Sequence, residues 1–136
     1  MSKIILLIFL HIFGDSVLLS KDLRKLKIHS KLYLLKHVGI YSAVLLIAGP
    51  FLLNLTIVES IEFSLLNGIL HYFIDYLITL YKLKYWINDL YKYVIVYSVL
   101  EHILHITILI GTFLFLFPHA ANLDIWYKFV DHYLSK

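Results

Sequence analysis

The sequence predicts an all-α polytopic membrane protein, with four transmembrane helices in a bundle and an amphipathic interfacial helix at the C-terminal end. Of its 136 residues, 61% are hydrophobic and 15% are charged, whereas soluble globular domains contain about 45–50% apolar and about 25% charged residues. The apolar residues gather in four long segments, each near the roughly 20 residues that a bilayer-spanning helix requires. The length allows one membrane domain, residues 1–136, and the lack of cysteine excludes disulfides and thiolate metal sites.

The four spans are predicted at about residues 4–20, 33–58, 61–81 and 93–117. The first span contains His11 and Asp15 and has no small-residue cleavage site, which favours a retained helix over a signal peptide. Pro50 predicts a kink or an early end in the second span. In residues 122–134, apolar side chains recur at helical spacing with charged residues between them, and this pattern predicts the interfacial helix.

Basic residues cluster in two of the predicted loops. Of the 12 Lys and Arg residues, nine lie in segments 21–36 and 82–92. The positive-inside rule places these two loops in the cytoplasm and both chain termini outside. We expect segment 21–36 to lie along the membrane and to bind anionic lipid headgroups, at about 1 kcal/mol for each basic residue near the surface. The expected partners are therefore membrane lipids, with further copies of the chain as a candidate partner, and no nucleic acid is expected.

Eight ionisable residues interrupt the apolar spans: His11, Asp15, His37, His71, Asp75, Glu101, His102 and His105. Three of the spans carry a histidine and a carboxylate four residues apart, which places the pair on one helical face with Cβ atoms about 5–6 Å apart. The predicted orientation brings all of these clusters to one depth, in the cytoplasmic half of the bilayer. Because a charge at the centre of a span costs about 2.5–3.5 kcal/mol, we expect these groups to converge and to satisfy one another.

Histidines and carboxylates that face inward from a four-helix bundle are the ligands of di-iron and di-manganese centres. The pattern therefore predicts a site for one or two divalent ions, with the ligands His11, Asp15, His37, His71, Asp75, Glu101 and His105. Imidazole with carboxylate suits Zn, Mn or Fe, and the sequence does not distinguish them. His102 is expected beside these ligands or against another protomer. Gly14 and Gly68, each three residues from a site residue, predict close approaches between helices.

Four stretches carry a family resemblance: "LHIFGDSVLLSKDLRK", "KHVGIY", "LNGILHYFIDYL" and "VLEHILHI". In order and spacing they resemble the bacterial membrane family catalogued as domain of unknown function 3307, from the N-terminus to about Thr107. The resemblance implies a multi-pass protein of the bacterial cytoplasmic (inner) membrane. It places the family's motif positions at His11, Gly14, Asp15, His37, His71, Asp75 and His105.

Three positions depart from that family's pattern. Ser20 stands where the family tends to have Gln, and Glu101 with His102 replaces an Asp-Gln pair. The lysine that often follows the third-span aspartate is absent, unless Lys82 takes its place one turn further on. A looser similarity to inner-membrane metal-dependent hydrolases favours a hydrolytic activity.

The function expected from these features is a metal-dependent hydrolase that acts on a lipid or lipid-linked (phospho)ester at the cytoplasmic leaflet. A bound ion would activate water, and Asp75 or Glu101 would serve as the general base. One alternative is a component of metal or proton transport, although the outer halves of the second and fourth spans contain no ionisable residue. The other alternative is a non-enzymatic partner protein whose polar cluster only specifies helix packing.

Overall fold

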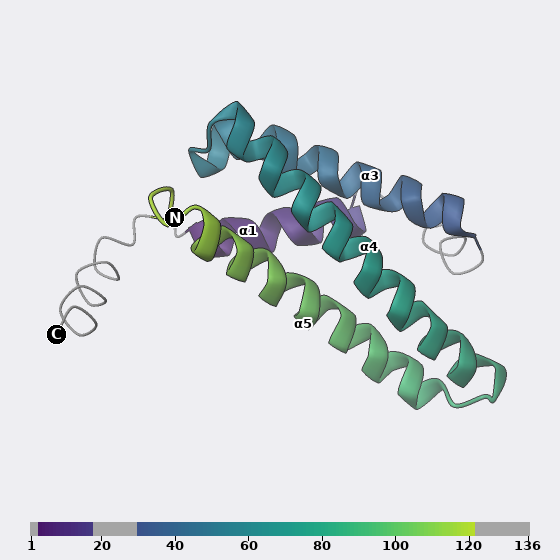
Figure 1. Ribbon diagram of the computed structural model, residues 1–136. Helices are drawn as coiled ribbons and strands as arrows, with labels where there is room; N and C mark the ends of the chain where they lie inside the picture. The colour runs from purple at the N-terminus through teal and green to yellow at the C-terminus, as the bar shows by residue number, and fades with distance from the viewer. Residues whose placement is uncertain (1–2, 18–29, 122–136) are drawn as a thin grey trace, which may run out of the picture.

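The computed structural model describes residues 3–17 and 30–121, and the regular structure within these two stretches is entirely helical (Figure 1). Helix α1 (Lys3–Ile12) continues into a π-helical turn, η1 (Phe13–Val17), and α3 (Lys31–Ala48) continues into a second one, η2 (Gly49–Leu53). Helices α4 (Ile57–Ile87) and α5 (Tyr91–Leu116) follow. The prediction of an all-α fold is confirmed for these residues. The predicted interfacial helix, 122–134, and most of the first basic segment lie outside the described residues.

Three helical segments are long and apolar enough to cross a membrane: Lys31–Leu53, Ile57–Ile87 and Tyr91–Leu116. This is consistent with a membrane protein. The predicted first span is described only over α1 and η1, which have 10 and 5 residues. At 1.5 Å per residue they measure about 22 Å, less than the roughly 30 Å of a hydrocarbon core. The described chain therefore contains three span-length helices, and the fourth span stays a prediction.

The start of α4 differs from the predicted start of the third span. The apolar run of the second span ends at Leu53, because the chain reverses at Asn54 with a left-handed φ of 59°. Thr56 and Glu59 then form a capping box, in which each side chain accepts a hydrogen bond from the other residue's backbone N–H. Such a box satisfies two N–H groups at the first turn, so α4 begins at Ile57.

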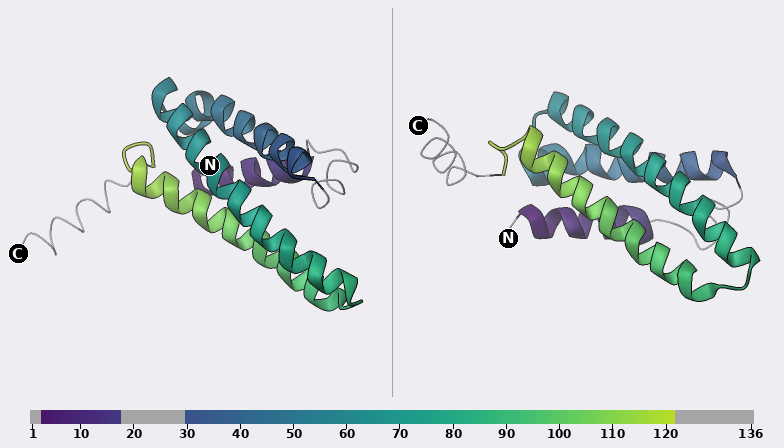
Figure 2. Two further views of the ribbon diagram at one scale, coloured as in Figure 1. Left: turned by 45° about the vertical axis from the view of Figure 1, so that its right-hand side comes forward. Right: turned by 60° about the horizontal axis from the view of Figure 1, so that its bottom comes forward.

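The four helices pack as a small bundle (Figures 1 and 2). Helix α4 contacts α3 on one side and α5 on the other, and α1 in turn contacts α3 and α5. The apolar core includes Leu7, Leu45, Phe63, Leu109 and Phe113, all of them buried. Large apolar side chains such as Phe51 (80% exposed) and Phe115 (85% exposed) face outward. Extended exposed apolar surface of this kind is typical of a membrane-contacting protein.

Two glycines lie where helices come close together: Gly68 of α4 faces α3, and Gly49 of η2 faces α4. A Cβ at Gly68 would lie 2.2 Å from Ser42 Oγ, and one at Gly49 would lie 2.2 Å from Ser60 Oγ and 2.6 Å from Ser60 Cβ. Because these positions leave no room for a side chain, the helices can draw together there. Ser64 Oγ adds a hydrogen bond of 2.7 Å to the Ser42 carbonyl across the same interface.

Candidate metal centre

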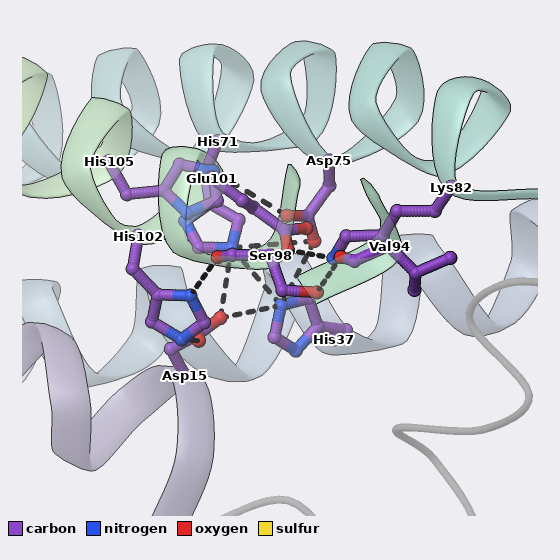
Figure 3. Close-up of polar contacts among 10 residues, drawn as sticks. All are labelled: Asp15, His37, His71, Asp75, Lys82, Val94, Ser98, Glu101, His102 and His105. Atoms are coloured by element: carbon purple, nitrogen blue, oxygen red, sulfur yellow. Dashed lines mark hydrogen bonds and ion pairs between the residues drawn. The ribbon is translucent and has the colours of Figure 1, made fainter. Parts of the chain in front are cut away.

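Four ligand atoms from three segments of the chain meet between α3, α4 and η1: Asp15 Oδ1, His37 Nε2, His71 Nε2 and Asp75 Oδ2 (Figure 3). His37 Nε2 lies 3.1 Å from Asp15 Oδ1, 3.2 Å from Asp75 Oδ2 and 3.1 Å from His71 Nε2. His71 Nε2 lies 3.4 Å from Asp15 Oδ1 and 3.6 Å from Asp75 Oδ2. All four side chains are buried.

These separations are close to those between ligand atoms that share one metal ion. A tetrahedral ion with ligand bonds of about 2.0–2.1 Å holds its ligand atoms about 3.3–3.4 Å apart, and the five distances run from 3.1 to 3.6 Å. A single imidazole nitrogen carries at most one proton. His37 Nε2 therefore cannot donate to all three of its neighbours, whereas a cation can be bound by several such atoms at once. Among the described residues, His37, His71 and Asp75 form one buried group that could hold a metal ion.

Local structure explains how the four side chains meet. His71 and Asp75 are one turn apart on α4, and side chains at this spacing share a helical face. His37 is in the second turn of α3. Asp15 lies within η1, and π-helical turns of this kind often occur at functional sites. Gly14 lets η1 approach α3, because a Cβ there would lie 3.2 Å from the Tyr41 ring.

His105 adds α5 to the cluster. Its Nε2 lies 3.5 Å from Asp75 Oδ1, and its ring stacks on that of His71 with centroids 3.8 Å apart and planes 8° apart. Asp15, His71 and His105 form a second group that could hold an ion. Five of the seven predicted ligands are thus brought together, and we call Asp15, His37, His71, Asp75 and His105 the His/Asp cluster.

The other two predicted ligands, His11 and Glu101, are buried beside the cluster but belong to neither ion-competent group found among the described residues. The centroid of the His11 ring lies 5.5 Å from the centroid of the His105 ring and 6.1 Å from that of the His71 ring. Glu101 forms an ion pair with Lys82, which lies two turns after Asp75 on α4. Ligand roles for His11 and Glu101, and the base roles of Asp75 and Glu101, remain predictions.

His102 has a contact that sequence reasoning left open. Its Nε2 lies 3.3 Å from Asp15 Oδ2, and its Nδ1 lies 2.8 Å from the Ser98 carbonyl oxygen. Because a carbonyl only accepts, Nδ1 is the donor in that bond. With 45% of its side chain exposed, His102 connects the buried Asp15 to the outside of the bundle. In the sequence, the spacing of four residues between Ser98 and His102 was the one indication of the bond to the Ser98 carbonyl.

The fold and the cluster together define a helical protein with span-length helices and a buried group of histidines and aspartates that could bind a metal ion. No family model matches the chain, and no match was found among curated proteins or solved structures. The resemblance to the bacterial membrane family therefore rests on the motifs quoted above.

Proposed function

We propose that the protein is an integral membrane, metal-dependent hydrolase that acts on a lipid or lipid-linked ester at the cytoplasmic leaflet. The observation that supports it best is that two buried imidazoles, His37 and His71, each lie within 3.1–3.6 Å of two buried carboxylates, Asp15 and Asp75, beside span-length helices. Burying charged groups is costly unless they are paired or bind metal. The basic residues of the predicted cytoplasmic loops support an anionic substrate on that side.

The ion would be held by Asp15, His37, His71 and Asp75, with His105 beside them. When bound, a divalent ion supplies Lewis acidity that polarises the scissile group and activates water. Asp75 is then engaged as a ligand, so Glu101 is the better candidate for general base. It lies one turn before His105 on α5, on the same helical face.

The packing on the far side of the cluster argues for hydrolysis over transport. The buried side chains there are mainly apolar: Leu7, Leu45, Phe63, Leu109 and Phe113. The buried polar groups among them are engaged in local bonds, such as that from Asn67 Nδ2 to the Phe63 carbonyl and that from Thr112 Oγ1 to Asn67 Oδ1. Among the described residues, packing of this kind offers ions no wet path along the helices.

The proposal is tested with the full chain purified in mild detergent, as wild type, Asp75→Asn and His119→Gln. Bound metal is measured by elemental analysis, and hydrolysis is measured on a set of phosphoester and carboxylic ester lipids in mixed micelles. We expect wild type to hold a divalent metal and to lose turnover with chelator. Asp75→Asn should lose both properties, and His119→Gln should retain both, since His119 is 58% exposed and contacts Glu59 instead. Turnover that survives in Asp75→Asn would contradict the mechanism.

A further inference from the structure

We infer that the centre holds two ions, with the second ion between His11 and His105. This rests on the metal centre of the proposed function and adds a second position to it. Metal pairs about 3.5–4 Å apart recur in phosphatases and nucleases, where together they stabilise the attacking and the leaving oxygens. Three features of the described residues lead to the second position.

The first feature is that the two oxygens of each aspartate face different histidines. Each aspartate turns one oxygen toward His37 and His71 and the other toward a histidine of α5 (Figure 3). Asp75 Oδ1 lies 3.5 Å from His105 Nε2, and Asp15 Oδ2 lies 3.3 Å from His102 Nε2. Asp75, with Oδ2 toward the first position and Oδ1 toward His105, can bridge two ions, as in the dinuclear carboxylate centres of helical bundles.

The second feature is a set of buried imidazole nitrogens. Both ring nitrogens of His11 and Nδ1 of His105 are buried without a hydrogen-bond partner in the described part of the chain, while His105 Nε2 faces Asp75 Oδ1 at 3.5 Å. A buried polar group without a partner costs roughly 1–3 kcal/mol. A ligand bound by the unpartnered nitrogens of these two rings would remove that cost. A cation meets this need directly, because neutral imidazole is a common metal ligand.

The third feature is the spacing of these two rings. Their centroids are 5.5 Å apart and their planes are inclined by 54°. Two imidazoles bound to one tetrahedral ion, at nitrogen–metal distances of about 2.0–2.1 Å, have ring centres about 5 Å apart. His11 and His105 therefore lie at a separation that one ion can bridge, with Asp75 Oδ1 next to His105 and Asp75 Oδ2 at the first position.

The second ion also narrows the substrate class. Two divalent ions carry four positive charges, whereas Asp15 and Asp75 together carry at most two negative charges. The excess positive charge favours an anionic phosphoester over a neutral carboxylic ester. In the hydrolysis, the water oxygen bonds to phosphorus, the bond from phosphorus to the leaving oxygen breaks, and that oxygen takes a proton that originates from the water.

The test loads chelator-stripped full chain in detergent with Mn²⁺ and measures bound metal and the electron paramagnetic resonance spectrum. We expect two ions per wild-type chain and a spectrum of exchange-coupled ions. His11→Gln and His105→Gln should halve the bound metal and give the six-line spectrum of an isolated ion. His119→Gln is the matched control and should keep two ions.

The outcomes separate this inference from the proposed function. One uncoupled ion per wild-type chain, or two ions retained in both variants, would overturn the second position and leave the hydrolase proposal standing. No bound metal in wild type would overturn both. The wild-type spectrum alone shows whether the chain binds two coupled ions, even if a variant does not fold.

Discussion

Glu101 and Lys82 form an ion pair beside the His/Asp cluster, and both side chains are largely withdrawn from solvent, at 4% and 12% exposed. Lys82 comes from α4 and Glu101 from α5, so the pair also ties these two helices together. Removing one partner of a buried ion pair is strongly destabilising, by about 3–5 kcal/mol, because the other charge is left uncompensated. Replacing both partners by neutral groups avoids that cost.

We therefore expect Lys82→Met to lower the stability of the protein by up to about 3 kcal/mol, somewhat below the fully buried case because Lys82 retains some exposure. The double variant with Lys82→Met and Glu101→Gln should recover most of the loss. The measurement is a double-mutant cycle on thermal or denaturant unfolding in detergent. Additive effects of the two substitutions would show that the pair makes no net contribution.

The sequence predicts the residues of the cluster better than their individual contacts. His71 and Asp75 lie on one unbroken helix, so their spacing of four residues correctly predicts a shared face. His11 and Asp15 have the same spacing, but η1 begins at Phe13 between them. A π-helical turn takes more residues than an α-helical turn, and this changes the angle between the two side chains. Asp15 therefore enters the four-atom group and His11 packs beside it.

At the scale of elements, the junction between η2 and α4 depends on Gly49. A Cβ at this position would lie 2.6 Å from Ser60 Cβ and 3.3 Å from Ser60 Cα. These atoms belong to the first turn and backbone of α4, so they cannot move aside without shifting the helix. Gly39 is also helical, in α3, but a Cβ there would meet no atom within 4 Å.

Gly49→Ala should therefore destabilise the protein by about 1–3 kcal/mol, the usual cost of overpacking. Gly39→Ala should be neutral or stabilising by up to about 1 kcal/mol, because alanine has the higher helix propensity. Unfolding in detergent, measured by circular dichroism for both variants, tests the difference. Equal effects would mean that η2 and α4 are not in close contact.

Element boundaries show where sequence reasoning reaches its limit. Residues Ile57 and Val58 are apolar, so hydrophobicity alone assigns them to the second span. The structure assigns them to α4, because the left-handed Asn54 and the capping box at Thr56 fix the start of the helix. Polar capping contacts of this kind set boundaries without changing the average hydropathy of a segment.

At the scale of the whole molecule, the number of spans decides where the termini lie. The turn after Ile87 and the turn before Ile57 are at opposite ends of α4 (Figure 1). Four spans place both termini on the same side, whereas three spans place them on opposite sides. The chain contains no cysteine, so single cysteines can be introduced into the natural sequence without background labelling.

We expect Glu62→Cys, Ser2→Cys and Ser135→Cys to react with a membrane-impermeant maleimide from outside the cell. Asn88→Cys should react only after permeabilisation, because the positive-inside rule places its turn in the cytoplasm. Labelling of Ser2→Cys and Ser135→Cys from opposite sides would mean that α1 does not cross the membrane.

Helix α4 has 31 residues and measures about 46 Å, so it exceeds a hydrocarbon core of about 30 Å and must tilt or project from it. Hydrophobic mismatch of this kind costs fractions of a kcal/mol per Å, and the tilt follows the local thickness of the bilayer. Asp75 lies 12 residues before the end of α4, about 18 Å along its axis. For an α4 that crosses the bilayer, we therefore expect the depth of the His/Asp cluster below the headgroups to decrease as the acyl chains shorten.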